Sequence, residues 1–214
     1  MKQILFALFF WVAGVSATSL EASEFFISEV MIEKIEREYG IFAKRRSVAL
    51  LEMMNVARLL SEKEKLEKVN DFFNATPYFT DQEIWGVSDY WETRLEFIGK
   101  DKGDCEDFVI AKYFTLKELG VPTTKLYMTY VKSTKFQVAH MVLTYYEKPN
   151  AVPLVLDNYN YKILPASLRE DLIPVYSFSG DDLFYAKQVQ LGKMLPAATK
   201  QKRAWDELSI KLKD

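Results

Sequence analysis

The stretch Gly103-Asp104-Cys105-Glu106-Asp107-Phe108 opens a run of helical periodicity that reaches Leu119. An apolar stripe on this run consists of Phe108, Ala111, Tyr113, Phe114 and Leu116. The solvent side is expected to carry Lys112, Lys117 and Glu118. Gly120 suits a left-handed cap and Pro122 cannot continue a helix, so both residues mark its end. The stretch predicts a central helix that begins at Cys105.

The chain before this helix also has helical patterning. Apolar residues recur at three- and four-residue spacing from residue 21 until Gly40 interrupts them, and a second helix is expected from about Ala43 to Leu60. A third should begin at Ser61, with Glu64 completing a capping box. Thr93 and Glu96 repeat that signature before a short helix that ends at Gly99. These segments predict a helical lobe over about residues 21–100.

After the central helix the period changes to two. Strands are expected at Leu126–Val131, Gln137–Tyr146 and Pro153–Asn158, with a further strand at Val175–Phe178 and a terminal helix at Ala204–Leu212. Helices followed by antiparallel strands predict an α+β fold, in which the sheet packs on the cysteine-bearing helix. This helix and the sheet would occupy about residues 101–190.

The composition describes an ordinary globular protein. Hydrophobic residues make up 49% of the 214 residues and charged residues 27%, and the formal net charge is -2. No basic stripe of the kind that a phosphate backbone requires is present in the sequence, which argues against nucleic acid as a partner. One domain is expected over residues 18–214.

The first 17 residues have the pattern of a signal peptide. Lys2 supplies a positive start, Ile4 to Ala13 is apolar, and Val15-Ser16-Ala17 is a small-residue cleavage pattern. The apolar run is shorter than the ~20 residues of a spanning helix, so no transmembrane span is expected. An exported protein with a single cysteine cannot form an internal disulfide, and a bacterial periplasm is the expected location.

Cys105 and His140 are the only cysteine and the only histidine of the chain. A thiol in the first turn of a helix is favoured as thiolate by the unpaired amides and the helix dipole, and the same amides can face an oxyanion. A cysteine at this position is also a common buried residue, and a lone histidine on a strand is often a core residue bonded to a backbone carbonyl.

Asp157 follows three large aliphatic residues on the next expected strand, where an unpaired acid would be costly. An imidazole neighbour would satisfy it. Cys105 as nucleophile, His140 as base and Asp157 as the group that fixes the imidazole tautomer would form a catalytic triad.

The acids beside the thiol, Asp104, Glu106 and Asp107, would raise the pKa of the thiol by like-charge repulsion. A hard divalent ion held by their oxygens would offset that repulsion. The alternative is that these acids only complement the helix dipole. The sequence has no Cys or His cluster for zinc.

Three segments together resemble a known family: Gly103-Asp104-Cys105-Glu106-Asp107, Ala139-His140-Met141-Val142-Leu143 and Val155-Leu156-Asp157-Asn158. In order and spacing they are similar to the signatures of the bacterial transglutaminase-like cysteine proteases of the LapG type. The earlier Asp81-Gln82-Glu83-Ile84-Trp85-Gly86 and Asp89-Tyr90-Trp91 add to the likeness, which covers roughly Val69 to Phe178.

The resemblance implies a papain-like, transglutaminase-type fold with Cys105, His140 and Asp157 as triad. It implies a periplasmic endopeptidase that cleaves a large surface adhesin near its N-terminus at a small-residue site such as paired alanines, which promotes biofilm dispersal. It further implies Ca²⁺ bound through Asp104, Glu106 and Asp107. An inner-membrane cyclic-di-GMP receptor of the LapD type would act as inhibitor.

Two other functions fit the same residues. A transglutaminase-type enzyme would pass the acyl group from the thioester to an amine instead of water. A binding module would use the fold without chemistry, in which case Cys105 should resist alkylation.

Overall fold

A computed structural model describes residues 28–179, 182–186, 191–194 and 200–212. The expected signal peptide and its cleavage position lie outside these residues. Within them, no helix combines the length and the apolar character needed to cross a membrane.

The N-terminal helices lie in or close to the predicted segments, and α3 and α5 begin at the predicted caps. They are α1 (Glu29–Tyr39), α2 (Ile41–Ala57) and α3 (Glu62–Asn74), followed by the short α4 (Asp81–Ile84) and α5 (Arg94–Lys100). Ser61 and Glu64 form the capping box of α3, and Thr93 and Glu96 form that of α5. Helix α4 was not predicted, because it is a single turn inside a connector rich in aromatic residues.

The central helix α6 (Cys105–Glu118) begins at the predicted residue. The predicted solvent side is correct for Lys117, which is exposed, but wrong for two residues: Lys112 is fully buried, and the Glu118 side chain is only 5% exposed where it pairs with Arg94. Most of helix α6 is covered, with α3 on one side and the strands on another, so Lys112 and Glu118 are paired internally instead of facing water.

The sheet has seven strands in the order β4-β3-β2-β1-β5-β6-β7, and every neighbouring pair is antiparallel. Their bounds are β1 (Leu126–Ser133), β2 (Ala139–Tyr145), β3 (Leu154–Leu156), β4 (Leu164–Pro165), β5 (Leu172–Ser179), β6 (Asp182–Ala186) and β7 (Leu191–Met194). Two 3-10 turns, η1 (Thr123–Lys125) and η2 (Ala166–Leu168), and the terminal helix α7 (Lys200–Lys211) complete the described elements. Strands β4, β6 and β7 were not predicted.

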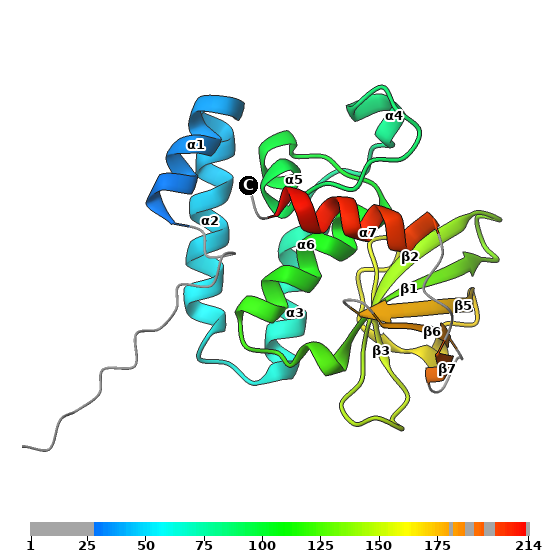
Figure 1. Cartoon of the computed structure of the whole chain (residues 1–214). Coiled ribbons are helices and arrows are strands. Elements are labelled where there is room, and N and C mark those ends of the chain that lie inside the picture. The colour runs from blue at the N-terminus through cyan, green and yellow to red at the C-terminus, as the bar shows by residue number, and fades with distance from the viewer. Residues whose placement is uncertain (1–27, 180–181, 187–190, 195–199, 213–214) are drawn as a thin grey trace, which may run out of the picture.

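The elements form a helical layer beside a sheet, with α6 between them and α7 crossing over both (Figure 1). One hydrophobic core joins these layers: Phe108 and Leu116 of α6 lie in it together with Met141 and Leu143 of β2. Trp205 of α7 stacks on Phe114 with ring centroids 5.9 Å apart, which fixes α7 against α6. This arrangement places the first turn of α6 next to β2.

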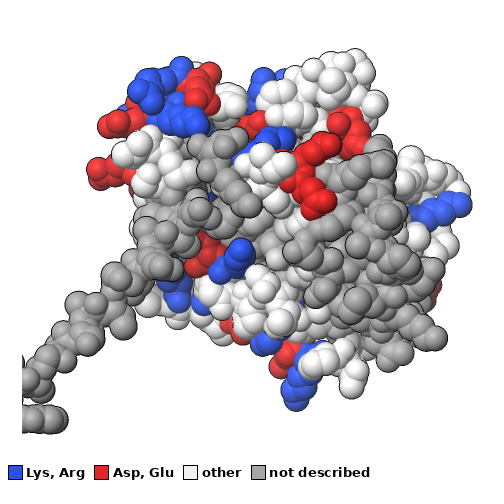
Figure 2. Space-filling model, viewed as in Figure 1, with Lys and Arg blue, Asp and Glu red and all other residues white. Residues whose placement is uncertain are grey.

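Charges of both signs are interspersed on the face drawn in Figure 2. This agrees with the absence of a basic stripe from the sequence.

Candidate active site

Cys105 is the first residue of α6 and is half-buried. The preceding Gly103 packs so closely that an added Cβ would lie 2.5 Å from the Phe97 ring and 2.9 Å from the Asp107 Cβ. Phe79 N–H donates to the Gly103 carbonyl at 3.0 Å, which holds the connector before α4 against the same loop. The glycine therefore allows two distant segments to meet at the thiol.

The surroundings of the thiol favour its protonated form. Cys105 Sγ donates to Glu106 Oε2 at 2.9 Å. Burial and the charges of Glu106 and Asp104 hold the pKa of Cys105 well above its ordinary value, while a hydrogen bond from the Met141 backbone lowers it. A base, or a counter-charge on these acids, is therefore required before the sulfur can act as a nucleophile.

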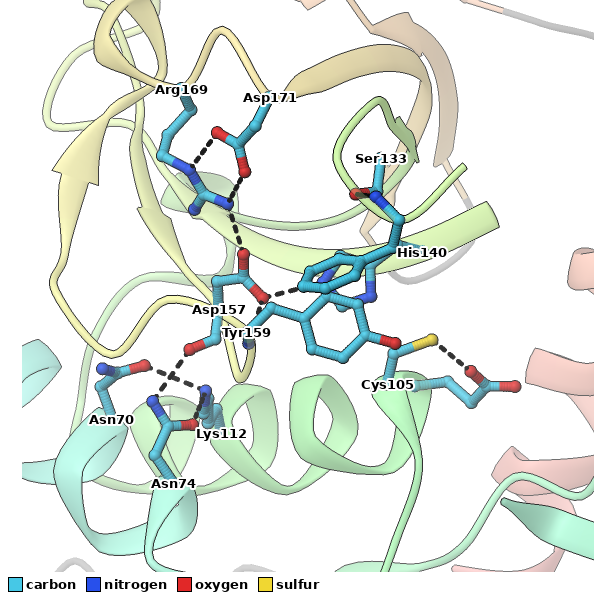
Figure 3. A network of polar contacts seen from close by, with 12 residues as sticks. Asn70, Asn74, Cys105, Lys112, Ser133, His140, Asp157, Tyr159, Arg169 and Asp171 are labelled. Carbon is cyan, nitrogen blue, oxygen red and sulfur yellow. Dashed lines mark hydrogen bonds and ion pairs between the residues drawn. The ribbon is translucent and has the colours of Figure 1, made fainter. Parts of the chain in front are cut away.

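His140 is buried. It lies near the thiol, since the backbone amide that donates to Sγ belongs to Met141, the next residue of β2. Its Nε2 lies 2.8 Å from Asp157 Oδ1. The Tyr159 ring stacks on the imidazole at a centroid distance of 4.1 Å with the planes 2° apart. Figure 3 shows the imidazole between Asp157 and the tip of α6 that carries Cys105.

The protonation of the imidazole follows from its partner. Burial alone would raise the pKa of Asp157, but the hydrogen bond and the charge of His140, together with hydrogen bonds from Tyr159 and Arg169, lower it to about 2. An ionised carboxylate only accepts, so Nε2 of His140 carries a proton that it donates to Asp157. Nδ1 is buried and has no hydrogen-bond partner within the described residues, so it is available to a proton from nearby.

A buried lysine supports the residues behind Asp157. Lys112 Nζ donates to Asn70 Oδ1 at 2.9 Å and to Asn74 Oδ1 at 2.7 Å, and Asn74 Nδ2 donates to the Asp157 carbonyl at 2.8 Å. Burial lowers the pKa of Lys112 to about 7. The network joins α6, α3 and the end of β3 (Figure 3), and it explains why α6 buries a lysine.

Acidic side chains from three segments converge on the other side of the thiol. Oxygens of Asp81, Asp104 and Asp107 lie within 4.8 Å of one another, and so do oxygens of Asp81, Asp89 and Glu106. Burial raises the pKa of Asp81 to about 6 and that of Asp104 to about 10, helped for Asp104 by the charges of Glu106 and Asp107.

Two oxygens of this group are available for a cation. Asp81 Oδ1 and Asp104 Oδ1 are buried without a hydrogen-bond partner in the described part of the chain. Asp107 already accepts backbone N–H groups with both oxygens, from Glu92 at 2.8 Å and from Asp104 at 3.0 Å. The buried, mutually repelling oxygens fit a hard divalent ion such as Ca²⁺.

The structure thus brings together every site residue that the sequence indicated. The sequence did not assign a role to Asp81, Asp89, Lys112 or Arg169, although each now contacts the site or its support. A usable signal existed for the first two, since they are acids in an aromatic-rich connector that precedes the motif.

Comparison with known proteins identifies the class of enzyme. Residues 46–170 match the family model described as bacterial transglutaminase-like cysteine proteinase BTLCP. The chain belongs to this family. A search of curated proteins gave no match.

Solved structures agree with the membership in this proteinase family. The chain is similar to LapG of Legionella pneumophila, with 40% sequence identity and a TM-score of 0.74 over 87% of this chain and 98% of that one. A calcium-bound LapG structure from the same organism has 42% identity and a TM-score of 0.74, and covers 87% of this chain and 99% of that one. A LapG structure described as EGTA-treated matches with 40% identity. The predicted α+β, transglutaminase-like fold and the predicted family are confirmed.

Proposed function

We propose that this proteinase is a calcium-dependent cysteine endopeptidase with Cys105 as nucleophile, His140 as base and Asp157 as the group that orients the base. The observation that carries the proposal is the hydrogen bonding of the two ring nitrogens of His140, the sole histidine. Its Nε2 donates to an ionised carboxylate 2.8 Å away, and its Nδ1 has no hydrogen-bond partner in the described part of the chain and lies near a strand amide that contacts the thiol.

In the first half of the reaction, Nδ1 of His140 takes the proton from Cys105 Sγ as the sulfur attacks the carbonyl carbon of the scissile bond. The amides in the first turn of α6 have no partner within the helix, so they are suited to donate to the oxyanion that forms. The imidazolium then gives its proton to the leaving amine, and a thioester remains on Cys105. Asp157 stabilises the imidazolium while it exists.

In the second half, water attacks the thioester carbonyl after giving a proton to Nδ1. The C–S bond breaks, the carboxylic acid leaves, and the proton returns from the imidazolium to the sulfur. Tyr159 contributes by stacking, because its ring limits rotation of the imidazole between the two steps.

Ca²⁺ would be held by Asp104, Glu106 and Asp107, as the sequence indicated, together with Asp81 and Asp89. Asp107 also closes the loop through its backbone hydrogen bonds. A bound Ca²⁺ supplies positive charge next to the thiol and so favours the thiolate. Glu106 both bonds the thiol and belongs to the acidic group, so a cation would compete with the sulfur for this carboxylate.

The substrate class rests on the family. The calcium-bound relative is a LapG protein, and we propose for this chain a large surface adhesin, cut near its N-terminus at a small-residue, di-alanine site. The enzyme would act in the periplasm, promote biofilm dispersal, and be restrained by an inner-membrane cyclic-di-GMP receptor of the LapD type.

The test incubates the mature enzyme with an N-terminal adhesin fragment in Ca²⁺ or in excess EGTA, and identifies the products by mass spectrometry. We expect one cut between small residues with Ca²⁺, none with EGTA, and recovery when Ca²⁺ is restored. Full activity in EGTA would overturn the calcium requirement. A labelled primary amine in the reaction distinguishes acyl transfer, since a transferase would incorporate the label and an endopeptidase would not.

A further inference from the structure

Arg169 lies behind the candidate triad and was not assigned a role by the sequence. Its backbone is fixed on both sides: Arg169 N–H donates to the Ala166 carbonyl at 3.1 Å, and Leu172 N–H donates to the Arg169 carbonyl at 3.1 Å. The Ala166 amide in turn donates to the Pro153 carbonyl at 2.8 Å, so the turn that carries Arg169 is attached next to the start of β3. The arginine is therefore held rigidly beside the strand that leads to Asp157.

The guanidinium is almost completely buried and is oriented by two carboxylates. Its Nε and Nη2 donate to Asp171 Oδ1 and Oδ2, both at 2.8 Å, which fixes the plane of the group. Nη2 also donates to Asp157 Oδ2 at 2.6 Å. The side chains of Arg169 and Asp157 are 2% and 0% exposed, so this pair is shielded from competing water.

Asp157 then has a donor for each oxygen. Oδ1 accepts from His140 Nε2 at 2.8 Å and from the Tyr159 amide at 2.9 Å, and Oδ2 accepts from Arg169. Without the arginine, Oδ2 would be a buried anionic oxygen with no partner among these groups, and the carboxylate could rotate or take up a proton. Both changes would release the imidazole from its orientation.

We propose that Arg169 is a positioning residue of the cysteine-protease reaction, which acts through Asp157 to keep the proton of His140 on Nε2 and the lone pair of Nδ1 toward Cys105. The inference rests on the proposed function, because it extends the triad to a fourth residue. Arg169 does not touch the reacting atoms.

The sole histidine makes this directly measurable, because NMR of the imidazole nitrogens in the untagged, Ca²⁺-loaded protein reports one residue. Wild type should show a proton on Nε2. Arg169→Gln should show a mixture of tautomers with faster exchange of the ring N–H with water. Its kcat should fall by roughly 10-fold to 100-fold with KM unchanged, the scale of a misplaced catalytic group. Arg169→Lys keeps the positive charge but loses the planar guanidinium that donates to both carboxylates, so it should give an intermediate kcat.

Two controls separate positioning from a loss of stability. Arg94→Gln removes a comparably buried arginine, paired with Glu118 at 2.8 Å, and should lower the melting temperature without changing the imidazole tautomer. The double variant Asp157→Asn/Arg169→Gln should be no slower than Asp157→Asn alone, because residues that act as a unit are not additive.

The outcomes distinguish the two proposals. An Nδ1–H tautomer in the wild type would refute the proposed base and with it the proposed function. A wild-type Nε2–H tautomer that persists in Arg169→Gln with unchanged kcat would refute the role of Arg169 alone. If Arg169→Gln does not fold, Arg169→Lys decides. A folded Arg169→Lys with the wild-type tautomer and kcat would refute the role of the guanidinium in orienting Asp157.

Discussion

Replacing Asp157 by Asn tests the orientation of the base most completely. Three donors surround the carboxylate, from His140, Tyr159 and Arg169, and an amide has only one acceptor oxygen. If the new NH₂ faces His140, Nε2 must become the acceptor and the imidazole proton moves to Nδ1, where it can no longer accept from the thiol. If the NH₂ faces Arg169 instead, a buried guanidinium loses its carboxylate.

The size of both effects follows from the structure. A wrong tautomer costs a triad enzyme about 10⁴-fold in kcat, or about 5.5 kcal/mol of transition-state stabilisation. The pKa of Asp157 falls from 3.8 to about 2 on folding, which corresponds to about 2–3 kcal/mol of stability at neutral pH. Because the folded pKa is the lower one, this stability is present above pH 3.8 and is lost as the pH falls toward 2.

The assay combines cleavage kinetics, imidazole NMR and denaturant unfolding at several pH values. Asp157→Asn should invert the tautomer or lose the Arg169 pair, and its stability deficit should shrink as the pH is lowered through 4. Asp171→Asn contacts Arg169 but not His140, so the imidazole tautomer should stay Nε2–H. The reasoning would be refuted if Asp157→Asn kept a kcat within tenfold of wild type and an unchanged imidazole tautomer.

Three further predictions concern the acids and the buried lysine. Because the pKa values of Asp104 and Asp81 are raised to about 10 and about 6, Ca²⁺ binding should release about one proton at pH 7 and about two at pH 5. Calorimetry in buffers of different ionisation enthalpy measures the number of protons released. Binding heats that do not depend on the buffer would contradict the prediction. Asp81→Asn should weaken Ca²⁺ binding at least tenfold by titration, on the scale of about 1.4 kcal/mol or more, whereas the remote Asp171→Asn should bind like wild type. Burial lowers the pKa of Lys112 from 10.5 to about 7, so between these pH values the unfolded chain binds one more proton than the folded protein, and stability rises with pH. The free energy of unfolding of wild type should therefore increase by about 2–3 kcal/mol relative to that of Lys112→Met between pH 7 and pH 9. A constant difference between the two proteins across that range would contradict this.

The sequence predicted the parts of the fold that depend on local patterns. The start of α6 at Cys105 and the capping boxes at Ser61 and Thr93 involve residues three positions apart, so they can be recognised without tertiary information. The alternating runs of β1, β2 and β3 were equally legible. The sole thiol, the sole imidazole and an acid that would be costly unpaired related Cys105, His140 and Asp157, and the family likeness agreed with that triad.

Long-range contacts account for what the sequence missed. Lys112 was expected in water because its neighbours in the helix suggested a polar face, but Asn70 and Asn74 of α3 supply its partners from about 40 residues away. Likewise, Asp81 joins the acids of α6 only because the Gly103 loop pairs with the connector before α4. Arg169 lies on an irregular turn, where no periodicity indicated that its guanidinium is buried.

The central claim is that the sole thiol and the sole imidazole act together on a peptide bond. The most direct measurement is cleavage of the adhesin fragment in Ca²⁺ by Cys105→Ala and by His140→Ala, each checked by circular dichroism for a wild-type fold. The account predicts no product from either variant in the time that wild type needs for complete cleavage. Product at the wild-type rate from either folded variant would contradict it.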